Sequence, residues 1–444
     1  MTTAAATLLR LDSGDLASSL PIAEDALADF RRAAVAALAC GLPDRRVEDW
    51  KYTSLKHLAG RSFAPAPETV DASAAASAIL PGLDDPSLPC VTIVDGRLVR
   101  EASRLDGLPA GVCLRPMSEL AAEGGELAAR IGTANERWQG VFFEALNGAC
   151  FTEGLVLHVA ANTKVETPIL MRVVDTGGDG PRLLCPRSLV VAEASSEVTI
   201  VEDHVGLDDA AETLLVSLVE VHAAKNARVR HLRIGREGRA TTAVPMIRAR
   251  LDRDAHFESH VGLFGGRIVR NEINPVLAGE NCECVLNGLV VPAGDQHVDN
   301  HMRVEHRVPH CRSRQYYKAI LNDESTGAFT GRIVVDDDAS GTDAVQSSES
   351  LVLGTRARAI TRPQLEIYDY DVKCTHGATV GQLDRDATFY LEARGVPREQ
   401  ARGLLVFAFA SDVLERFGVD AIERASAARL RERIPFARGL EELD

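Results

Sequence analysis

The sequence has no long apolar run and no basic run. Its longest apolar stretch, Leu404 to Ala410, is much shorter than the roughly 18 residues of a membrane-spanning helix. The formal net charge of -15 argues against general binding to nucleic acid or to anionic membranes. Asp12 and Asp15 interrupt the first apolar patch, so the N-terminus does not resemble a signal peptide.

Common catalytic and metal-binding motifs are missing too. The sequence contains no phosphate-binding loop, no Gly-x-Ser-x-Gly elbow, no His-Glu-x-x-His and no Cys-x-x-Cys. Its nine cysteines are scattered without a disulfide framework, which indicates a reducing compartment. We therefore expect a cytoplasmic protein. A chain of 444 residues is long enough for two or three domains, or for one elongated domain with attachments. Its 45% hydrophobic and 25% charged residues are ordinary for a soluble globular protein.

The first region, residues 1–147, is expected to be helical with a small α/β part. Asp95-Gly96 lies between two short β-rich runs and predicts a hairpin. The expected helices are Ala23 to Leu38, Ser118 to Ile131 and Asn135 to Leu146, and the expected hairpin strands are Cys90 to Val94 and Arg97 to Val99.

Residues 148–383 have a different pattern. Short β-rich runs follow one another, separated by polar turns such as Ala194-Ser195-Ser196 and Ala224-Lys225-Asn226. The first four turns recur at roughly 27 to 30 residues, a spacing typical of repeat architectures. This pattern favours a mainly β fold with a β-solenoid core over a sandwich of hairpins. The repeat is expected to break between about Pro292 and Asp323.

Residues 384–444 are predicted to be helical again. Asp384 is a plausible N-cap and Gly395 a plausible stop for a helix over Ala387 to Ala393. Pro397 opens a second helix, and a third covers Val419 to Arg433. The second helix has a predicted apolar stripe, formed by Ala401, Leu404, Leu405, Ala408 and Phe409. This region could cap the solenoid or dock a partner, and the two roles are compatible.

Cys374 and His376 are the candidate metal ligands. In a strand, residues two positions apart point to the same side, so a thiol and an imidazole would face one way. Such a pair suits a soft metal, but zinc and iron-sulfur centres normally take four protein ligands. The pair is thus half a site, whose missing ligands would come from elsewhere in the chain or from another chain.

The other histidines and cysteines are expected to be structural. The densest group is His297, His301, His306, His310 and Cys311, and local hydrogen bonding is favoured over metal binding for it. Cys282 and Cys284 alternate and are expected to be small core residues. The isolated cysteines, expected to pack in the interior, are Cys40, Cys90, Cys113, Cys150 and Cys185.

Several motifs resemble the SufB/SufD family of iron-sulfur cluster assembly proteins. They are Glu48-Asp49-Trp50-Lys51-Tyr52-Thr53, Lys318-Ala319-Ile320-Leu321-Asn322-Asp323, Gly327-Ala328-Phe329-Thr330-Gly331, Ser350-Leu351-Val352-Leu353-Gly354, Pro363-Gln364-Leu365-Glu366-Ile367, the Cys374/His376 stretch and Phe389-Tyr390-Leu391-Glu392-Ala393-Arg394-Gly395. Within the family the chain is more similar to the SufD branch. SufB-type members carry Glu-His-Glu-Ala-Thr where this chain has Thr375-His376-Gly377-Ala378-Thr379, and a cysteine where it has Ser348.

The resemblance implies a right-handed parallel β-helix between helical ends and a non-catalytic scaffold role. It implies a heterodimer with SufB through the β-helix and docking of the SufC ATPase on the C-terminal helices. His376 would reach a transient iron-sulfur cluster shared with SufB, with Cys374 as a less secure ligand. No stably bound cofactor is expected in the isolated chain, which could also form a homodimer.

Two other functions are possible alternatives to a role in cluster assembly. A carbohydrate-active enzyme on a β-helix would need carboxylates converging on a groove, and the dense acidic group, Asp336-Asp337-Asp338, is better explained as a solvated turn. A structural homodimer without any role at a cluster is the second rival.

Overall fold

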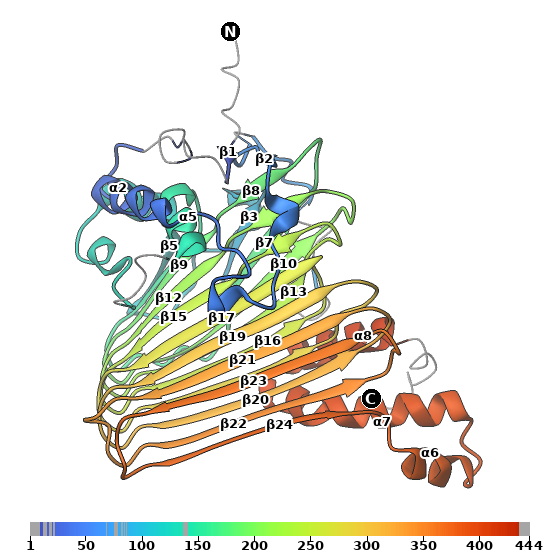
Figure 1. The fold of residues 1–444 in the computed structure, drawn as a ribbon. Helices are drawn as coiled ribbons and strands as arrows, with labels where there is room; N and C mark the ends of the chain where they lie inside the picture. Colours follow the sequence, from blue (N-terminus) through green and yellow to red (C-terminus); the bar gives the residue numbers. More distant parts are fainter. Residues whose placement is uncertain are drawn as a thin grey trace.

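The computed structural model describes residues 9–434, apart from 12–15, 17–19, 21–22, 68, 75–78, 81–82, 84, 86 and 136–140. Its centre is a parallel β-solenoid with helices near both ends of the chain (Figure 1). The predicted mainly β solenoid fold is therefore confirmed. Among the described residues, every helix is too short or too polar to cross a membrane.

Two long stacks of strands form the solenoid. The first stack is β3 (Cys90–Val94), β7 (Ile169–Asp175), β10 (Glu197–Gly206), β13 (Arg228–Arg236), β16 (His256–Leu263), β18 (Glu283–Val290), β20 (Arg312–Leu321), β22 (Asp343–Val352) and β24 (Lys373–Gly381), with β4 (Arg97–Leu98) antiparallel to β3. The second stack is β5 (Val112–Pro116), β6 (Leu155–Val159), β9 (Arg187–Ala192), β12 (Leu218–Ala223), β15 (Met246–Leu251), β17 (Ile268–Leu277), β19 (His297–His306), β21 (Thr326–Val335) and β23 (Arg358–Ile367).

Together the stacks make about 8 coils, from β6 and β7 to β23 and β24. The shorter strands β8 (Arg182–Leu184), β11 (Thr213–Leu215) and β14 (Thr242–Ala243) pair beside the early coils, and β1 (Leu9–Arg10) pairs with β2 (Ser62–Phe63). Alternate side chains point into the lumen, where Val198, Val229 and Phe257 belong to one continuous apolar core. Burial of this core, at about 25 cal/mol per Å² of apolar surface, holds the coils together.

One corner of the solenoid repeats with the same backbone conformation. Ser195, Asn226, Asp254, Asn281 and His310 each have a φ of 59° to 64°, a left-handed conformation that Asn and Asp tolerate better than most residues. The amide of each of these residues donates a hydrogen bond to a carbonyl of the next coil, as Asn226 N does to Arg253 O. Because His310 continues this series, the predicted break in the repeat is wrong, and β19 and β20 are complete strands.

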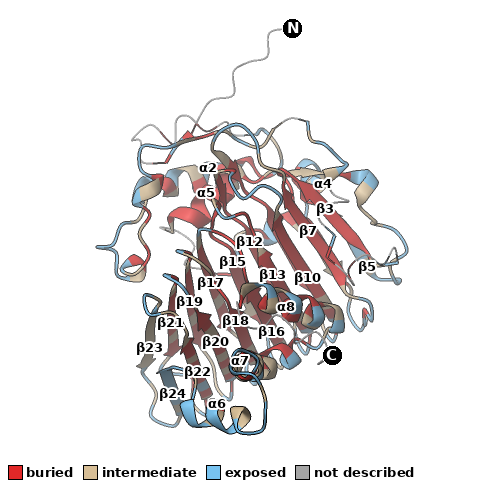
Figure 2. Ribbon diagram, turned by 90° about the vertical axis from the view of Figure 1, so that its right-hand side faces the viewer, coloured by how far each residue is buried: buried red, intermediate tan, exposed pale blue. Residues whose placement is uncertain are grey.

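Helices cover the outer faces of the two stacks at different places (Figures 1 and 2). Near the start, α2 (Ala28–Ala37) and α5 (Phe142–Cys150) pack on the second stack, close to the shorter α4 (Met117–Glu123). The 3-10 turns are η1 (Leu38–Cys40), η2 (Glu48–Trp50), η3 (Lys56–Leu58), η4 (Arg100–Ala102), η5 (Ala128–Arg130) and η6 (Glu415–Phe417). The predicted hairpin is confirmed as β3 and β4, whereas the helix predicted from Ser118 ends at Glu123.

The C-terminal helices are α6 (Arg385–Glu392), α7 (Arg398–Leu414) and α8 (Asp420–Arg433). Asp384 caps α6 by accepting hydrogen bonds from two backbone amides, as predicted, and Gly395 has a φ of 89° just before α7. Val406 and Ala410 of α7 pack with outward-facing residues of the first stack, such as Leu232 and Leu289. The predicted stripe is wrong in part. Of its members only Ala401 is buried, because the face of α7 that meets the solenoid is Ala401, Gly403, Val406, Ala410, Val413 and Leu414.

Candidate functional site at the last coil

The last coil of the solenoid is open. In the described part of the chain, β24 pairs only with β22, and β23 pairs only with β21, so both strands are sheet edges. Most residues of β24 are exposed and those of β23 are half-buried, in contrast to the strands behind them (Figure 2). A long edge strand with unpaired backbone groups is a template for pairing with another chain.

Cys374 and His376 both lie on β24, so the strand predicted for them is confirmed. Cys374 continues a lumen-facing column in register with Ala344, and it packs against the small apolar cluster around that residue. His376 shares this side of the strand, because the two are two positions apart. Cys374 is half-buried and His376 is exposed at the open end.

The thiol of Cys374 is a protonated group at neutral pH. Burial raises the pKa of Cys374, the nearby carboxylate of Asp343 raises it further, and the backbone amide of Ala344 opposes both. A metal binds the thiolate, so binding at Cys374 would displace a proton. No group of three or more His, Cys, Asp or Glu side chains within the described residues is arranged to hold a metal ion. Cys374 and His376 are two potential donors, fewer than the four ligands that zinc and iron-sulfur centres normally take.

Ser348 occupies the lumen side of β22, opposite Ala378 of β24. It is 3% exposed and borders a very small cavity of about 10 Å³, which Tyr317 and Phe329 also line. A thiol at this place would face the same lumen as Cys374 and His376. The hydroxyl that stands there is a poor ligand for soft metals.

The histidines upstream do not form one site. His297 Nε2 lies 2.9 Å from the Thr53 hydroxyl, outside the solenoid, while His306 Nε2 lies 2.9 Å from the Ser313 hydroxyl in the lumen. The expectation of local hydrogen bonding is confirmed for these two residues. Cys282 and Cys284 belong to the lumen core, also as expected. Cys40 and Cys113 are exposed, so the prediction that they pack in the interior is wrong.

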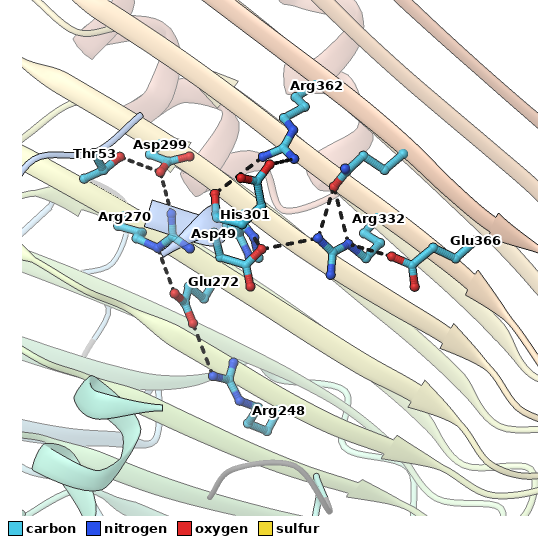
Figure 3. Close-up of polar contacts among 12 residues, drawn as sticks. Asp49, Thr53, Arg248, Arg270, Glu272, Asp299, His301, Arg332, Arg362 and Glu366 are labelled. Atoms are coloured by element: carbon cyan, nitrogen blue, oxygen red, sulfur yellow. Dashed lines mark hydrogen bonds and ion pairs between the residues drawn. The ribbon is translucent and has the colours of Figure 1, made fainter. Parts of the chain in front are cut away.

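The N-terminal motif Glu48 to Thr53 is bound to the outer face of the second stack (Figure 3). Trp50 is buried, with the Arg270 guanidinium 4.0 Å from its ring centroid. The Thr53 hydroxyl donates to Asp299 Oδ2 at 2.5 Å, and Arg270 donates to the same oxygen at 2.6 Å. Sequence reasoning assigned no contact to this motif, because Arg270 and Asp299 lie more than 200 residues away in the chain.

Charged side chains continue from this motif along five coils to the open end (Figure 3). The ion pairs are Arg248–Glu272, Arg270–Glu272, Arg270–Asp299, Asp49–His301, Asp49–Arg332, Arg332–Glu366 and Glu48–Arg362. Burial alone would raise the pKa of Glu272, but Arg270 and Arg248 outweigh burial and lower the pKa to about 2. The facing imidazole of His301 lowers the pKa of Asp49, against the effect of burial. The motif thereby reaches β23, the edge strand of the last coil.

Lys318 fastens α7 to the solenoid near the same end. Its ammonium group lies 2.8 Å from Asp412 Oδ1, donates to Phe409 O at 2.9 Å and lies 3.5 Å from Glu349 Oε2. Tyr316 Oη donates to the other oxygen of Asp412 at 2.7 Å. These contacts join α7 to β20 and β22, directly behind β24.

The described part of the chain is a parallel β-solenoid whose open last coil carries Cys374 and His376 on one side of β24. The SufBD core domain of the SUF iron-sulfur cluster assembly system matches residues 174–409, and the SufBD N-terminal region matches residues 21–171. The chain belongs to the SufB/SufD family of iron-sulfur cluster assembly proteins.

Relatives of the chain include three curated proteins. It is 31% identical to the iron-sulfur cluster assembly protein SufD of Escherichia coli, over 90% of each chain. It is 29% identical to a SufBD family iron-sulfur cluster assembly protein of Synechocystis, over 88% of this chain and 86% of the relative. It is also 29% identical to the chloroplastic protein ABCI7 of Arabidopsis thaliana, over 84% of this chain and 79% of the relative.

Proposed function

We propose that the chain is a non-catalytic scaffold subunit that completes a transient iron-sulfur cluster site together with SufB. The observation that carries this proposal is the open last coil, which presents Cys374 and His376 beside unpaired strand edges. Two soft or borderline donors are half of a cluster site, and a pairing partner at the same edge could bring the others.

The backbone of β24 suits pairing with SufB at this edge. Lys373 N donates to Thr342 O of the preceding coil, and alternate residues of a parallel strand bond to the same neighbour. The amides of Cys374, His376 and Ala378 accordingly face outward. Val380, which is 55% exposed, adds apolar surface there. A strand of SufB laid against β24 would satisfy these groups and cover both candidate ligands.

The C-terminal helices are the proposed docking site for the SufC ATPase. Phe389 and Tyr390 of α6 are 70% and 56% exposed, whereas the apolar face of α7 is already used by the solenoid. Large exposed aromatic side chains are typical anchors of protein interfaces. We place the docking surface on α6 and on the exposed side of α7. Lys318 would transmit movement of α7 to the coils behind His376.

Co-expression with SufB and SufC, followed by native mass measurement, tests the pairing. Ala378→Pro removes one outward amide without removing a hydrogen bond to β22, so it should lower recovery of the SufB complex several-fold while the melting temperature of the chain is kept. Unchanged recovery would contradict pairing through β24. Exclusive self-association of the wild-type chain would favour the structural homodimer instead.

Phe389→Glu tests the docking of SufC separately. We expect it to abolish co-purification of SufC while SufB still binds, because a charge at an apolar anchor leaves an unpaired group in the interface. Asp386→Asn, an exposed change on the same helix, is the control and should leave SufC bound.

A further inference from the structure

The lumen behind His376 contains two stacked amide side chains. Gln315 of β20 and Gln346 of β22 are in register on neighbouring coils, and Gln346 Nε2 donates to Gln315 Oε1 at 2.9 Å. The two residues are 2% and 1% exposed. Stacked amides of this kind form hydrogen-bonded ladders along the direction in which strands are added.

The side chain of Gln346 is held in place by the opposite wall of the lumen. A Cβ atom at Gly331 of β21 would lie 2.0 Å from Gln346 Nε2, so the amide fits only because residue 331 is a glycine. This close approach and the bond to Gln315 fix the orientation of the amide. The other polar atom of the Gln346 amide is therefore also buried in the lumen.

That other atom is unsatisfied. Gln346 Oε1 is buried and has no hydrogen-bond partner among the described residues. A buried polar atom without a partner costs about 1–3 kcal/mol, so it marks a place where a donor is expected. The next residue in the same column of the solenoid is His376, the register partner of Gln346 on β24. Neighbouring strands lie about 4.8 Å apart, within the reach of an imidazole turned toward the lumen.

We propose that Gln346 is a positioning residue that accepts a hydrogen bond from one imidazole nitrogen of His376. The hydrogen-bonded column of Gln315 and Gln346 then extends to the imidazole of His376 on the last coil. An acceptor on one nitrogen fixes the proton there and leaves the lone pair of the other nitrogen free. Metal-binding histidines generally have such a second partner, which sets both the tautomer and the direction of the ring.

This inference rests on the proposed role of His376 and adds how its imidazole is prepared. The free nitrogen points away from Gln346, and so toward the open end where a partner chain would place a metal. The register partner of Cys374 is Ala344, whose side chain has no polar atom, so it offers no side-chain acceptor of the kind that Gln346 offers His376. The structure thus gives a reason for His376 to be the better-defined ligand of the two.

The tautomer of His376 tests the proposal without any metal. The full chain, labelled with ¹⁵N in its histidines, is measured at a pH where the ring is neutral, and His376→Ala identifies the signals. We expect two well-separated ¹⁵N shifts for His376, the pattern of one tautomer. In Gln346→Ala the two shifts should move toward each other, because both tautomers are then populated. Gln346→Glu keeps an acceptor and should keep the separation.

Two further variants keep this test decisive. Gly331→Ala, which displaces the amide, should reproduce the effect of Gln346→Ala, whereas Ser348→Ala on the same strand should not. Averaged shifts in the wild type, or unchanged shifts in both Gln346→Ala and Gly331→Ala, would overturn the proposal. Because no cluster is present, these results are independent of whether His376 binds iron, which the cluster content of His376→Ala decides.

Discussion

The guanidinium carbon of Arg270 lies over the ring of Trp50, 4.0 Å from the ring centroid. The same guanidinium donates hydrogen bonds to Glu272 at 2.8 Å and to Asp299 at 2.6 Å. The side chain of Arg270 is only 1% exposed. Phe143 of α5 packs on the ring of Trp50 at 5.2 Å between centroids. The motif Glu48 to Thr53 therefore fastens the N-terminal region to the outer face of the solenoid.

Replacing Trp50 by Ala should destabilise the protein by about 3–5 kcal/mol, because it empties a buried aromatic site and uncovers the Arg270 ion pairs. Chemical denaturation measures the change. Tyr52→Ala is the matched control in the same motif; Tyr52 is only half-buried, so its loss should cost clearly less. Equal effects of the two substitutions would contradict the fastening role of Trp50.

His306 should make stability depend on pH. Burial lowers its pKa to about 4 from an ordinary value of 6.5, and the nearby Arg314 acts in the same direction. The unfolded chain then binds the proton more readily than the folded chain. The stabilising contribution is fully present above pH 6.5 and is lost as the pH falls from 6.5 toward 4. A shift of this size corresponds to about 3 kcal/mol.

The measurement is the free energy of unfolding between pH 4.5 and 7, for the wild type and His306→Gln. Glutamine can keep a hydrogen bond to Ser313 but does not titrate, so the variant should lose less stability on acidification. Other buried histidines, such as His297, are present in both proteins, so their contributions to the pH dependence of stability cancel when the two proteins are compared. If the free energy of unfolding changes with pH in the same way in both proteins, His306 is not the source of the loss of stability on acidification.

Lys318 should hold α7 on the solenoid. Lys318→Met keeps an unbranched chain but removes the charge that contacts Asp412 and the carbonyl of Phe409, and charged hydrogen bonds of this kind contribute about 1.5–3 kcal/mol. Hydrogen exchange in α7 should become faster while exchange in β18 stays slow. Glu399→Ala removes a surface contact of 3.5 Å to Arg402 on the same helix and should leave exchange nearly unchanged.

The repeat and the secondary structure around it could be predicted from the sequence. Polar turns at regular spacing indicate coils, and alternation in β24 places Cys374 and His376 on one side. The apparent break after Pro292 was misleading, because His310 adopts the left-handed conformation that Asn or Asp takes in the earlier coils. A histidine at that corner gives no turn signal in the sequence.

Long-range partners could not be predicted. The contacts of Trp50 with Arg270 and of Lys318 with Asp412 join residues far apart in the chain, and nothing local in either motif specifies its partner. The stripe assigned to α7 failed for a related reason. Several sides of α7 carry apolar residues, and which side is buried depends on how the helix packs on the first stack. The sequence of the helix alone does not specify that packing. The column that joins Gln346 to His376 likewise depends on the strand register.

The most direct test of the account is the iron and acid-labile sulfide that co-purify anaerobically with the complex of this chain, SufB and SufC, compared between the wild type and His376→Ala. Thr375→Ala, the neighbouring exposed position on the other side of β24, is the matched control. The account predicts an intact complex with a several-fold loss of iron and sulfide in His376→Ala and no loss in Thr375→Ala. Unchanged cluster content in an intact His376→Ala complex would contradict it.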